Sequence, residues 1–363
     1  MSSSKLESFL RSFNADTELR EIQAPVREEL DGVDERIRGF FQSDIALLQG
    51  LSSHVLGLKG KKYRPTLLLL IARMGEAKRE DAIFGAAIIE LIHTATLIHD
   101  DTIDKSLVRR GLPTINALYN GYVSTILGDF IYTKAFLELL DRGIPALAPV
   151  VARTTYRMSI GEILQIEQRN DLETGEEDYY RLIDEKTSSL MAASTSMGAL
   201  LAGMDEHGVE RFRRFGEDLG RAYQITDDLF DYIGDQERMG KGVRGDLAEG
   251  KITLPLIHAL ANSTGRVHAR LREFAAKREL SDPEWDELIG LLSETGAITY
   301  CRDTANQLAD RALAHLDAGN APGEKPRPTA EEAPPPTDRS LDRNSAERAA
   351  LQQAVAYAVR RDH

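Results

Sequence analysis

The sequence predicts an all-α protein that folds as a single-domain helical bundle. Apolar residues recur at three- and four-residue spacing over stretches too long for strands, whereas the period-two alternation of strands is scarce. Glycine and proline mark the expected joints, in "GKKYRP" at 60–65, "RRGLPT" at 109–114 and "MGKGVRGD" at 239–246. The expected helical segments are 66–74, 82–104, 122–140, 146–168, 208–233 and 286–316.

The composition is that of a folded protein that does not bind nucleic acid. Its hydrophobic content of 42% is enough for a sizeable core, which excludes a disordered chain. A net charge of −13 argues against a surface that neutralises phosphate backbones. The single cysteine, Cys301, cannot form a disulfide within the chain, and the expected localisation is cytoplasmic.

Neither an export signal nor a transmembrane segment is expected in the first half of the chain. Charges interrupt the apolar positions of residues 1–23, so no signal peptide is expected there. The most apolar window, 82–99, contains Glu90 and His93 and leads directly into aspartates. We therefore interpret this window as a buried helix.

The last part of the chain is divided by proline. Six of the 13 prolines fall within "APGEKPRPTAEEAPPPT" at 321–337, a composition that predicts an exposed linker. The tail then regains an apolar stripe that is typical of a helix. We expect a helical domain over 1–320, the linker over 321–337, and a C-terminal helix within 338–363 that packs back on the same domain. If 321–337 is only a linker, its deletion leaves activity intact.

Two acidic triplets share one spacing, "DDTID" at 100–104 and "DDLFD" at 227–231. On a helix, Asp100 and Asp104 lie one turn apart on the same face. Such like charges repel one another, and apolar neighbours add a desolvation cost, unless cations neutralise them. Magnesium prefers oxygen ligands and is commonly held by one or two carboxylates together with substrate phosphates. The candidate ligands are Asp100, Asp101, Asp104, Asp227, Asp228 and Asp231.

A solvated helix face is the alternative interpretation of an acidic run. For one triplet alone it would be the better interpretation. The first triplet, however, directly follows "LIHTATLIH", and the second continues into "LFDYI". Both sequences demand burial on several sides of the helix. The pair therefore favours a metal site that clamps a diphosphate.

Cationic residues that suit a diphosphate lie near the joints and the triplets. The glycines of "GKGVRG" match a dinucleotide fingerprint, but no strand precedes them, so that interpretation is rejected. His93 lies two helical turns before Asp100, where it either donates to phosphate or serves as a core histidine, whereas His99 is assigned to structure. The candidate cations are Lys61, Arg64, Arg109, Arg110, Lys186, Lys241 and Lys251.

Seven stretches occur in the order of one known family's motifs. They are "GKKYRP", "IHTATLIHDDTIDKSLVRRGLPT", "GDFIYTKAF", "GEILQ", "KTSSLM", "QITDDLFDYIGD" and "GKGVRGDLAEGKITLP". Through them the sequence closely resembles the trans-isoprenyl diphosphate synthases, or polyprenyl synthetase family, over roughly residues 50–260. The resemblance implies an all-α fold around a deep central cavity, usually as a homodimer, with the two aspartate motifs facing each other at its mouth.

The resemblance also implies a reaction and its residues. Isopentenyl diphosphate is joined to an allylic diphosphate with Mg2+ as cofactor, and a peripheral membrane contact would serve product release. Asp100, Asp104 and Asp227 resemble the principal magnesium ligands, supported by Asp101, Asp228 and Asp231. The isopentenyl diphosphate site is implied at Lys61, Arg64, His93 and Arg110. The allylic diphosphate is implied at Arg109, Lys186, Lys241 and Lys251, and the carbocation path at Thr187 and Gln224.

Product length is expected to depend on the residues just before the first triplet. In this family they point down the cavity in which the product grows, and here they are the small Ala95 and Thr96. A helical turn rises about 5.4 Å, close to one isoprene unit, so a large side chain there would stop growth early. We expect products longer than farnesyl, and we expect Ala95→Phe to shorten them. The alternative is a deeper cavity floor, at Ile92, Ile88 or a facing residue such as Phe130.

Two other functions are weighed against prenyl transfer. Class I terpene cyclases also ionise allylic diphosphates, but they usually replace the second aspartate motif and need no isopentenyl diphosphate site. A non-catalytic partner subunit would keep the fold, yet such subunits typically lose aspartates. Both triplets are intact here, which favours the enzyme.

Overall fold

The computed structural model describes residues 17–57, 60–109, 111–234, 244–317 and 338–360. Helices make up nearly all of this part of the chain. The only strands in it, β1 (Val108–Arg109) and β2 (Leu112–Pro113), form one short antiparallel hairpin. The prediction of an all-α fold is confirmed.

The helices are named here in chain order. The first half has η1 (Ala24–Val26), α2 (Arg27–Phe40), α3 (Ala46–Gly57), α4 (Tyr63–Ala72), α5 (Arg79–Ile103), α6 (Ile115–Leu118), α7 (Gly121–Arg142) and α8 (Leu147–Gln168). The second half has α9 (Glu176–Ile183), the π-helix η2 (Asp184–Ser188), α10 (Ser189–Leu201), α11 (Glu206–Ile233), α12 (Gly245–Ala248), α13 (Leu254–Ala261), α14 (Gly265–Lys277), α15 (Asp282–Glu294), α16 (Ala297–Asp317) and α17 (Asp338–Arg360).

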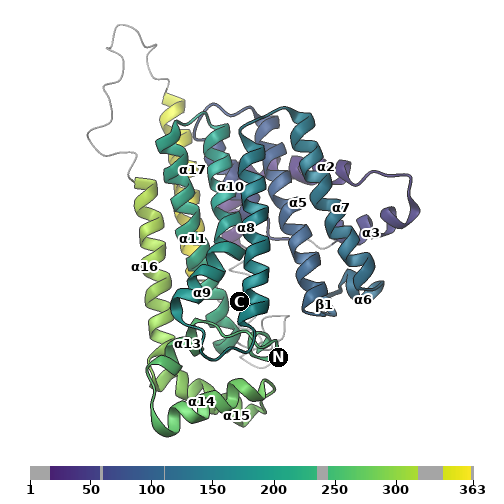
Figure 1. Cartoon of the computed structure of the whole chain (residues 1–363). Coiled ribbons are helices and arrows are strands. Elements are labelled where there is room, and N and C mark those ends of the chain that lie inside the picture. The colour runs from purple at the N-terminus through teal and green to yellow at the C-terminus, as the bar shows by residue number, and fades with distance from the viewer. Residues whose placement is uncertain (1–16, 58–59, 110, 235–243, 318–337, 361–363) are drawn as a thin grey trace, which may run out of the picture.

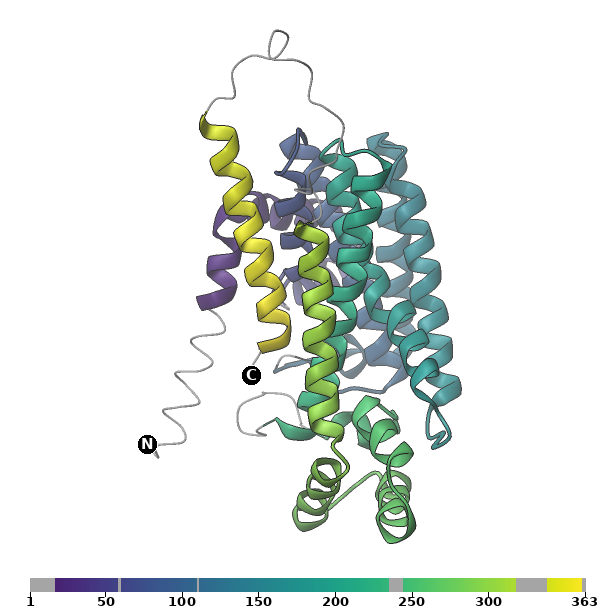
Figure 2. The ribbon, with the colours of Figure 1, turned by 90° about the vertical axis from the view of Figure 1, so that its left-hand side faces the viewer.

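The long helices run along one axis of the bundle (Figure 1). Helix α10 lies at its centre and packs against α4, α5, α8 and α11. Small residues permit this close approach: a Cβ atom on Gly198 would lie 2.7 Å from Leu68 O, and one on Gly216 would lie 2.6 Å from Ala192 Cα. The shorter helices α14 and α15 lie at one end of the bundle (Figure 2).

The expected helical segments mostly correspond to single helices, and one prediction is wrong. Residues 286–316 form two helices instead of one, because α15 ends at Glu294 and α16 begins at Ala297. Gly296 between them has φ +75°, in the left-handed region where glycine carries no steric penalty. The apolar spacing continues across this break, which is why periodicity alone does not reveal it.

Helix α17 lies beside α16 (Figure 2) and also contacts α4 and α11. Tyr63 Oη donates to Ala354 O over 2.7 Å. Arg73 Nε donates to Glu347 Oε1 over 2.9 Å. These bonds tie α17 to α4. The predicted linker at 321–337 lies outside the described residues.

Helix α5 is the one helix in the described ranges that is long and apolar enough to span a membrane. Most of its apolar window, 61%, is buried inside the protein. It packs against α2, α4, α7 and α10. This agrees with the interpretation of residues 82–99 as a buried helix.

Candidate active site

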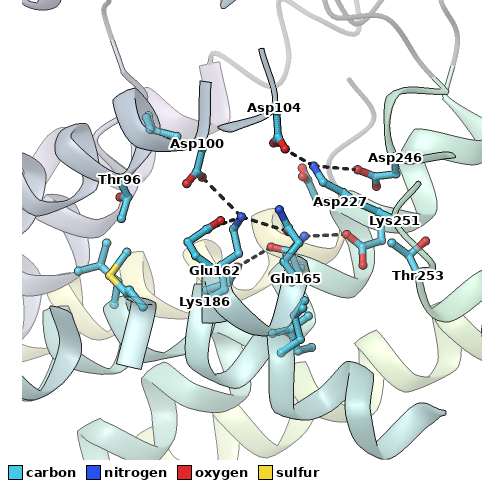
Figure 3. Close-up of a pocket in the computed structure, with 18 of the residues that line it drawn as sticks. Thr96, Asp100, Asp104, Glu162, Gln165, Lys186, Asp227, Asp246, Lys251 and Thr253 are labelled. Atoms are coloured by element: carbon cyan, nitrogen blue, oxygen red, sulfur yellow. Dashed lines mark hydrogen bonds and ion pairs between the residues drawn. The ribbon is translucent and has the colours of Figure 1, made fainter. Parts of the chain in front are cut away.

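A cavity of about 360 Å3 lies between α5, α8, α9, η2 and α11 (Figure 3). Residues of α4, β1, α10, α12 and the connection between α12 and α13 also line it. Clefts of this kind, with convergent polar groups, are the usual sites of ligand binding. The predicted site residues that line it are Arg64, His93, Thr96, Asp100, Asp104, Arg109, Lys186, Thr187, Gln224, Asp227, Asp228 and Lys251.

The first triplet divides its carboxylates between the cavity and the hairpin. Asp100 and Asp104 line the cavity, since residues four apart share a helix face. Asp101 is buried outside the lining, where its two oxygens accept from Arg109 Nε over 2.8 and 2.9 Å. Asp101 therefore holds Arg109, which itself lines the cavity.

Asp100 shares one lysine with Glu162 of α8. Lys186 Nζ lies 3.6 Å from Asp100 Oδ2 and also pairs with Glu162. Burial raises the pKa of Asp100 to about 7; Lys186 opposes this rise and Glu162 adds to it. In the described part of the chain, Asp100 Oδ1 and Glu162 Oε2 are buried without a hydrogen-bond partner. These oxygens are suited to a cation.

Asp104 is held by cations from two connections. Arg169 Nη2 lies 2.5 Å from Asp104 Oδ1. Lys251 Nζ lies 3.6 Å from Asp104 Oδ2 (Figure 3). Lys251 also pairs with Glu249 and lies 3.8 Å from Asp246 Oδ1. Burial lowers the pKa of Lys251, but these acidic groups outweigh burial and raise it, so the ammonium is kept charged.

The second triplet also divides its roles. Asp227 and Asp228 line the cavity. Both oxygens of Asp228 are already bonded, to Tyr179 Oη over 2.6 Å and to Gln224 Nε2 over 2.6 Å. Asp231 is outside the lining and accepts from the backbone N–H groups of Gly245 and Asp246, over 3.1 and 3.0 Å. Burial, with Asp246 adding to it, raises the pKa of Asp231 to about 7.

A hydrogen-bonded chain connects the second triplet to η2. Thr187 Oγ1 donates to Gln224 Oε1 over 2.7 Å, and Gln224 in turn donates to Asp228. Thr187 and Lys186 lie in the π-helical turn, a conformation found mostly at functional sites. Helix α8 approaches this turn at Gly161, where a Cβ atom would lie only 2.6 Å from Lys186 N.

Arg64 and His93 form a second group in the cavity. Arg64 Nη1 lies 3.3 Å from His93 Nε2. Lys61, predicted for the same group, is exposed outside the lining, with Nζ 5.8 Å from the Tyr357 ring centroid. Arg110 and Lys241 lie outside the described residues.

The predicted product-length residues occupy different surroundings. Thr96 lines the cavity, and its Oγ1 donates to His93 O over 2.8 Å. Ala95 has no exposed surface and is outside the lining. His99 faces α7, where Nε2 lies 3.2 Å from Thr125 O, in agreement with a structural histidine.

Sequence reasoning missed several residues of the cavity. Glu162 and Gln165 lie three apart in "GEILQ", a spacing that puts both on one helix face and was a usable signal. Gln165 Oε1 accepts from Lys186 Nζ over 3.1 Å. Arg169, Tyr179 and Asp246 are among the other lining residues that were missed.

The carboxylates do not enclose a metal ion by themselves. Within the described residues, no group of three acidic, histidine or cysteine side chains is arranged to hold one. Buried, unpartnered carboxylate oxygens at Asp100 and Glu162 nevertheless face the cavity, beside several cations. This donor set fits magnesium, which keeps waters and shares its ligands with phosphates.

Known proteins resemble this chain over most of its length. The polyprenyl synthetase family profile matches residues 45–292. The all-trans-nonaprenyl-diphosphate synthase (geranyl-diphosphate specific) of Rhodobacter capsulatus is 38% identical, over 82% of this chain and 91% of that protein. The octaprenyl diphosphate synthase of Escherichia coli is 35% identical, over 82% and 92%.

A solved structure shares the fold. It is a polyprenyl synthase from Caulobacter crescentus complexed with calcium and isoprenyl diphosphate, 31% identical, with a TM-score of 0.82. The alignment covers 95% of this chain and 98% of that one. The fold, the cavity and the family match together confirm the sequence resemblance, and the chain belongs to the polyprenyl synthetase family.

Proposed function

We propose that this prenyl transferase joins isopentenyl diphosphate to an allylic diphosphate, head to tail, and makes an all-trans polyprenyl diphosphate longer than farnesyl. One observation carries the proposal: aspartates of α5 and α11 line a single cavity together with Arg64, Arg109, Lys186 and Lys251, four of the cations expected for two diphosphates. The octaprenyl and nonaprenyl names of the relatives support a long product.

Asp100, Asp104 and Asp227 would hold magnesium, which when bound neutralises charge on the departing diphosphate. The other aspartates of the triplets act through protein groups. Asp101 orients Arg109, and Asp231 caps the turn at α12. This division separates the three aspartates proposed as metal ligands from those that organise neighbouring protein groups.

Arg109, Lys186 and Lys251 hold the allylic diphosphate, assisted by Lys241. Charge-assisted hydrogen bonds to phosphate oxygens stabilise the leaving group most strongly when its charge develops. The hydroxyl hydrogen of Thr187 is engaged in the hydrogen bond to Gln224, so the lone pairs of Oγ1 can face the positive charge of the allylic fragment. These groups thus serve both products of ionisation.

Arg64 and His93 hold isopentenyl diphosphate, together with Lys61 and Arg110. Arg64 and His93 contact each other, whereas Lys251 pairs with Asp104, and this difference in partners supports two diphosphate subsites in one cavity. The alkene attacks the allylic cation, and the departed pyrophosphate accepts the proton that is lost. No side-chain nucleophile is needed.

A second copy of the chain is the proposed partner. Apolar side chains are exposed on the outer faces of α7 and α8, with Tyr122 at 78% and Leu140 at 71% exposure. Exposed apolar side chains of this kind are candidates for a protein–protein interface. The proposed enzyme is a cytoplasmic homodimer that contacts the membrane peripherally during product release. The other exposed large apolar residues of these two helices are Ile126, Leu137, Tyr156, Ile163 and Ile166.

Incubation of the purified chain with magnesium, isopentenyl diphosphate and one primer at a time tests the proposal. The primers are dimethylallyl, geranyl, farnesyl and geranylgeranyl diphosphate, and the products are identified by mass. A ladder of linear products is expected. Pyrophosphate release with a cyclic hydrocarbon would indicate a terpene cyclase instead.

If the isolated chain forms no product, it would instead be a non-catalytic partner subunit. One relative, 34% identical, is named heptaprenyl diphosphate synthase component 2, of Geobacillus stearothermophilus. Turnover without any added protein would exclude this alternative.

A further inference from the structure

We propose that Arg169 is a substrate-binding residue that competes with the metal for Asp104 and then binds the diphosphate once the metal displaces it. This inference rests on the proposed function and adds a residue to it. It concerns how the binding of the metal and the binding of the diphosphate depend on each other.

Arg169 has one partner in the cavity. Its Nη2 lies 2.5 Å from Asp104 Oδ1, and within the described residues this is its only hydrogen bond. Its Nε is buried and unpartnered in the same part of the chain, and its side chain is only 28% exposed. The guanidinium has further N–H donors and lies beside a proposed phosphate site, so it can bind a second acceptor.

The backbone fixes Arg169 at this place. Helix α8 ends at Gln168, and Arg169 leaves it with ψ 121°. The next residue, Asn170, donates its N–H to Gly250 O over 2.8 Å, and Gly250 adopts φ +77°. The connection that carries Arg169 is thereby joined to the one that carries Lys251.

Arg169 is the principal counter-charge of Asp104. The Asp104 side chain is 9% exposed, so its ionised form needs a nearby cation. Lys251 lies farther away, at 3.6 Å, and is shared with Asp246 and Glu249. Arg109 differs from Arg169 because both Nε and Nη2 engage Asp101, a carboxylate outside the cavity lining.

A metal that uses Asp104 Oδ1 must therefore displace a guanidinium. If the metal binds alone, Arg169 loses its ion pair with Asp104 and gains no new partner. When a diphosphate enters with the metal, the released guanidinium gains phosphate oxygens, which match its planar donors. Metal and diphosphate are then expected to bind cooperatively, each raising the affinity for the other.

Binding of Mn2+, in place of Mg2+, tests the inference without turnover. Free Mn2+ is measured by its electron paramagnetic resonance signal, with the full chain alone and with inorganic pyrophosphate. In Arg169→Gln we expect Mn2+ alone to bind about tenfold more tightly, and pyrophosphate at saturating Mn2+ to bind about tenfold more weakly. Opposite signs are the signature, because structural damage would weaken both.

Two further variants make the outcomes separable. Arg142→Gln breaks an ion pair with Asp81 far from the cavity and should change neither affinity. Asp104→Asn should weaken Mn2+ binding; if it does not, Asp104 is not a ligand and the proposed metal site fails. If Asp104→Asn weakens Mn2+ but Arg169→Gln leaves Mn2+ affinity unchanged or lower, the role of Arg169 is refuted and the proposed function stands. Circular dichroism melting verifies that each variant folds.

Discussion

Tyr179 Oη donates a hydrogen bond to Asp228 Oδ2 over 2.6 Å, from α9 to a carboxylate on α11. Gln224 occupies the other oxygen of the same carboxylate. Burial raises the pKa of Asp228 well above its ordinary value, and the Tyr179 and Gln224 hydrogen bonds act against this rise. Asp228 therefore organises Gln224 and Thr187, whereas Asp100 offers a buried oxygen that has no hydrogen-bond partner among the residues that the structure describes.

Tyr179→Phe should lower both stability and turnover. It leaves a buried acceptor unsatisfied, which costs about 1–3 kcal/mol of unfolding free energy. Loss of this hydrogen bond should also lower kcat more than it raises KM, because Gln224 and Thr187 act on the developing cation. Urea unfolding and steady-state kinetics measure the two effects.

Tyr180→Phe is the matched control, since Tyr180 follows Tyr179 in the same helix and contacts its ring. We expect it to change kcat little. Equal effects of the two variants would show that the Tyr179 hydroxyl has no special part in the site.

Gly161→Ala should disturb the π-helical turn. The added methyl group would lie 2.6 Å from Lys186 N, so α8 and η2 must separate. Overpacking of this kind costs about 1–3 kcal/mol, and displacement of Lys186 should lower kcat/KM for the allylic substrate. Thermal melting and kinetics test it.

Gly290→Ala provides the comparison within a helix. A Cβ atom at Gly290 would meet nothing within 4 Å, so this variant should be about 0.5–1 kcal/mol more stable than the wild type. If Gly161→Ala is equally harmless, the close approach to Lys186 does not constrain the site.

The metal-free protein should lose stability as pH rises toward neutrality. The pKa of Asp100 is raised to about 7 by burial, so folding favours its protonated form. Its stabilising contribution is complete below the unfolded pKa, about 4, and is lost as pH rises through about 7. Relative to Asp100→Asn, the unfolding free energy of the wild type should fall by at most about 4 kcal/mol between those values.

Magnesium should reverse this loss at pH 7.5 in the wild type and much less in Asp100→Asn. Urea titrations with and without the ion measure the difference. A wild type whose metal-free stability follows that of Asp100→Asn across this range would contradict the raised pKa.

Thr96→Phe should shorten the product. Thr96 lines the cavity one turn below Asp100, so an aromatic ring there would block chain growth about 6 Å from the carboxylate. Ala95→Phe, also expected to shorten the product, replaces a residue with no exposed surface and should cost more stability. Mass analysis of products decides; unchanged length in both variants would refute the wall assignment.

The sequence was informative where one helix carries the whole pattern. The D-D-x-x-D spacing placed Asp100 and Asp104 on one face, because helical geometry is local. It could not show that Asp101 turns to Arg109, since that contact depends on how the following hairpin folds back. Arg169 and Tyr179 reach the cavity through packing between segments distant in sequence, which no local pattern encodes.

The same limit explains the break at Gly296 and the position of Lys61. A glycine within a helical pattern is tolerated in some contexts and ends a helix in others. Here Gly296 adopts a left-handed conformation, which separates α15 from α16. Lys61 precedes α4 and is exposed, whereas Arg64, three positions later, faces the cavity.

The bond between Tyr63 and Ala354 joins positions 291 residues apart. At ribosomal rates of about 5–20 residues per second, Tyr63 is made about 15–60 s before its acceptor exists. During that interval the face of α4 that α17 covers in the finished protein has no cover from its own chain. Closure of the bundle over α4 therefore waits for the synthesis of α17, and a nascent chain that stalls before α17 would present an apolar surface to the cell's chaperones.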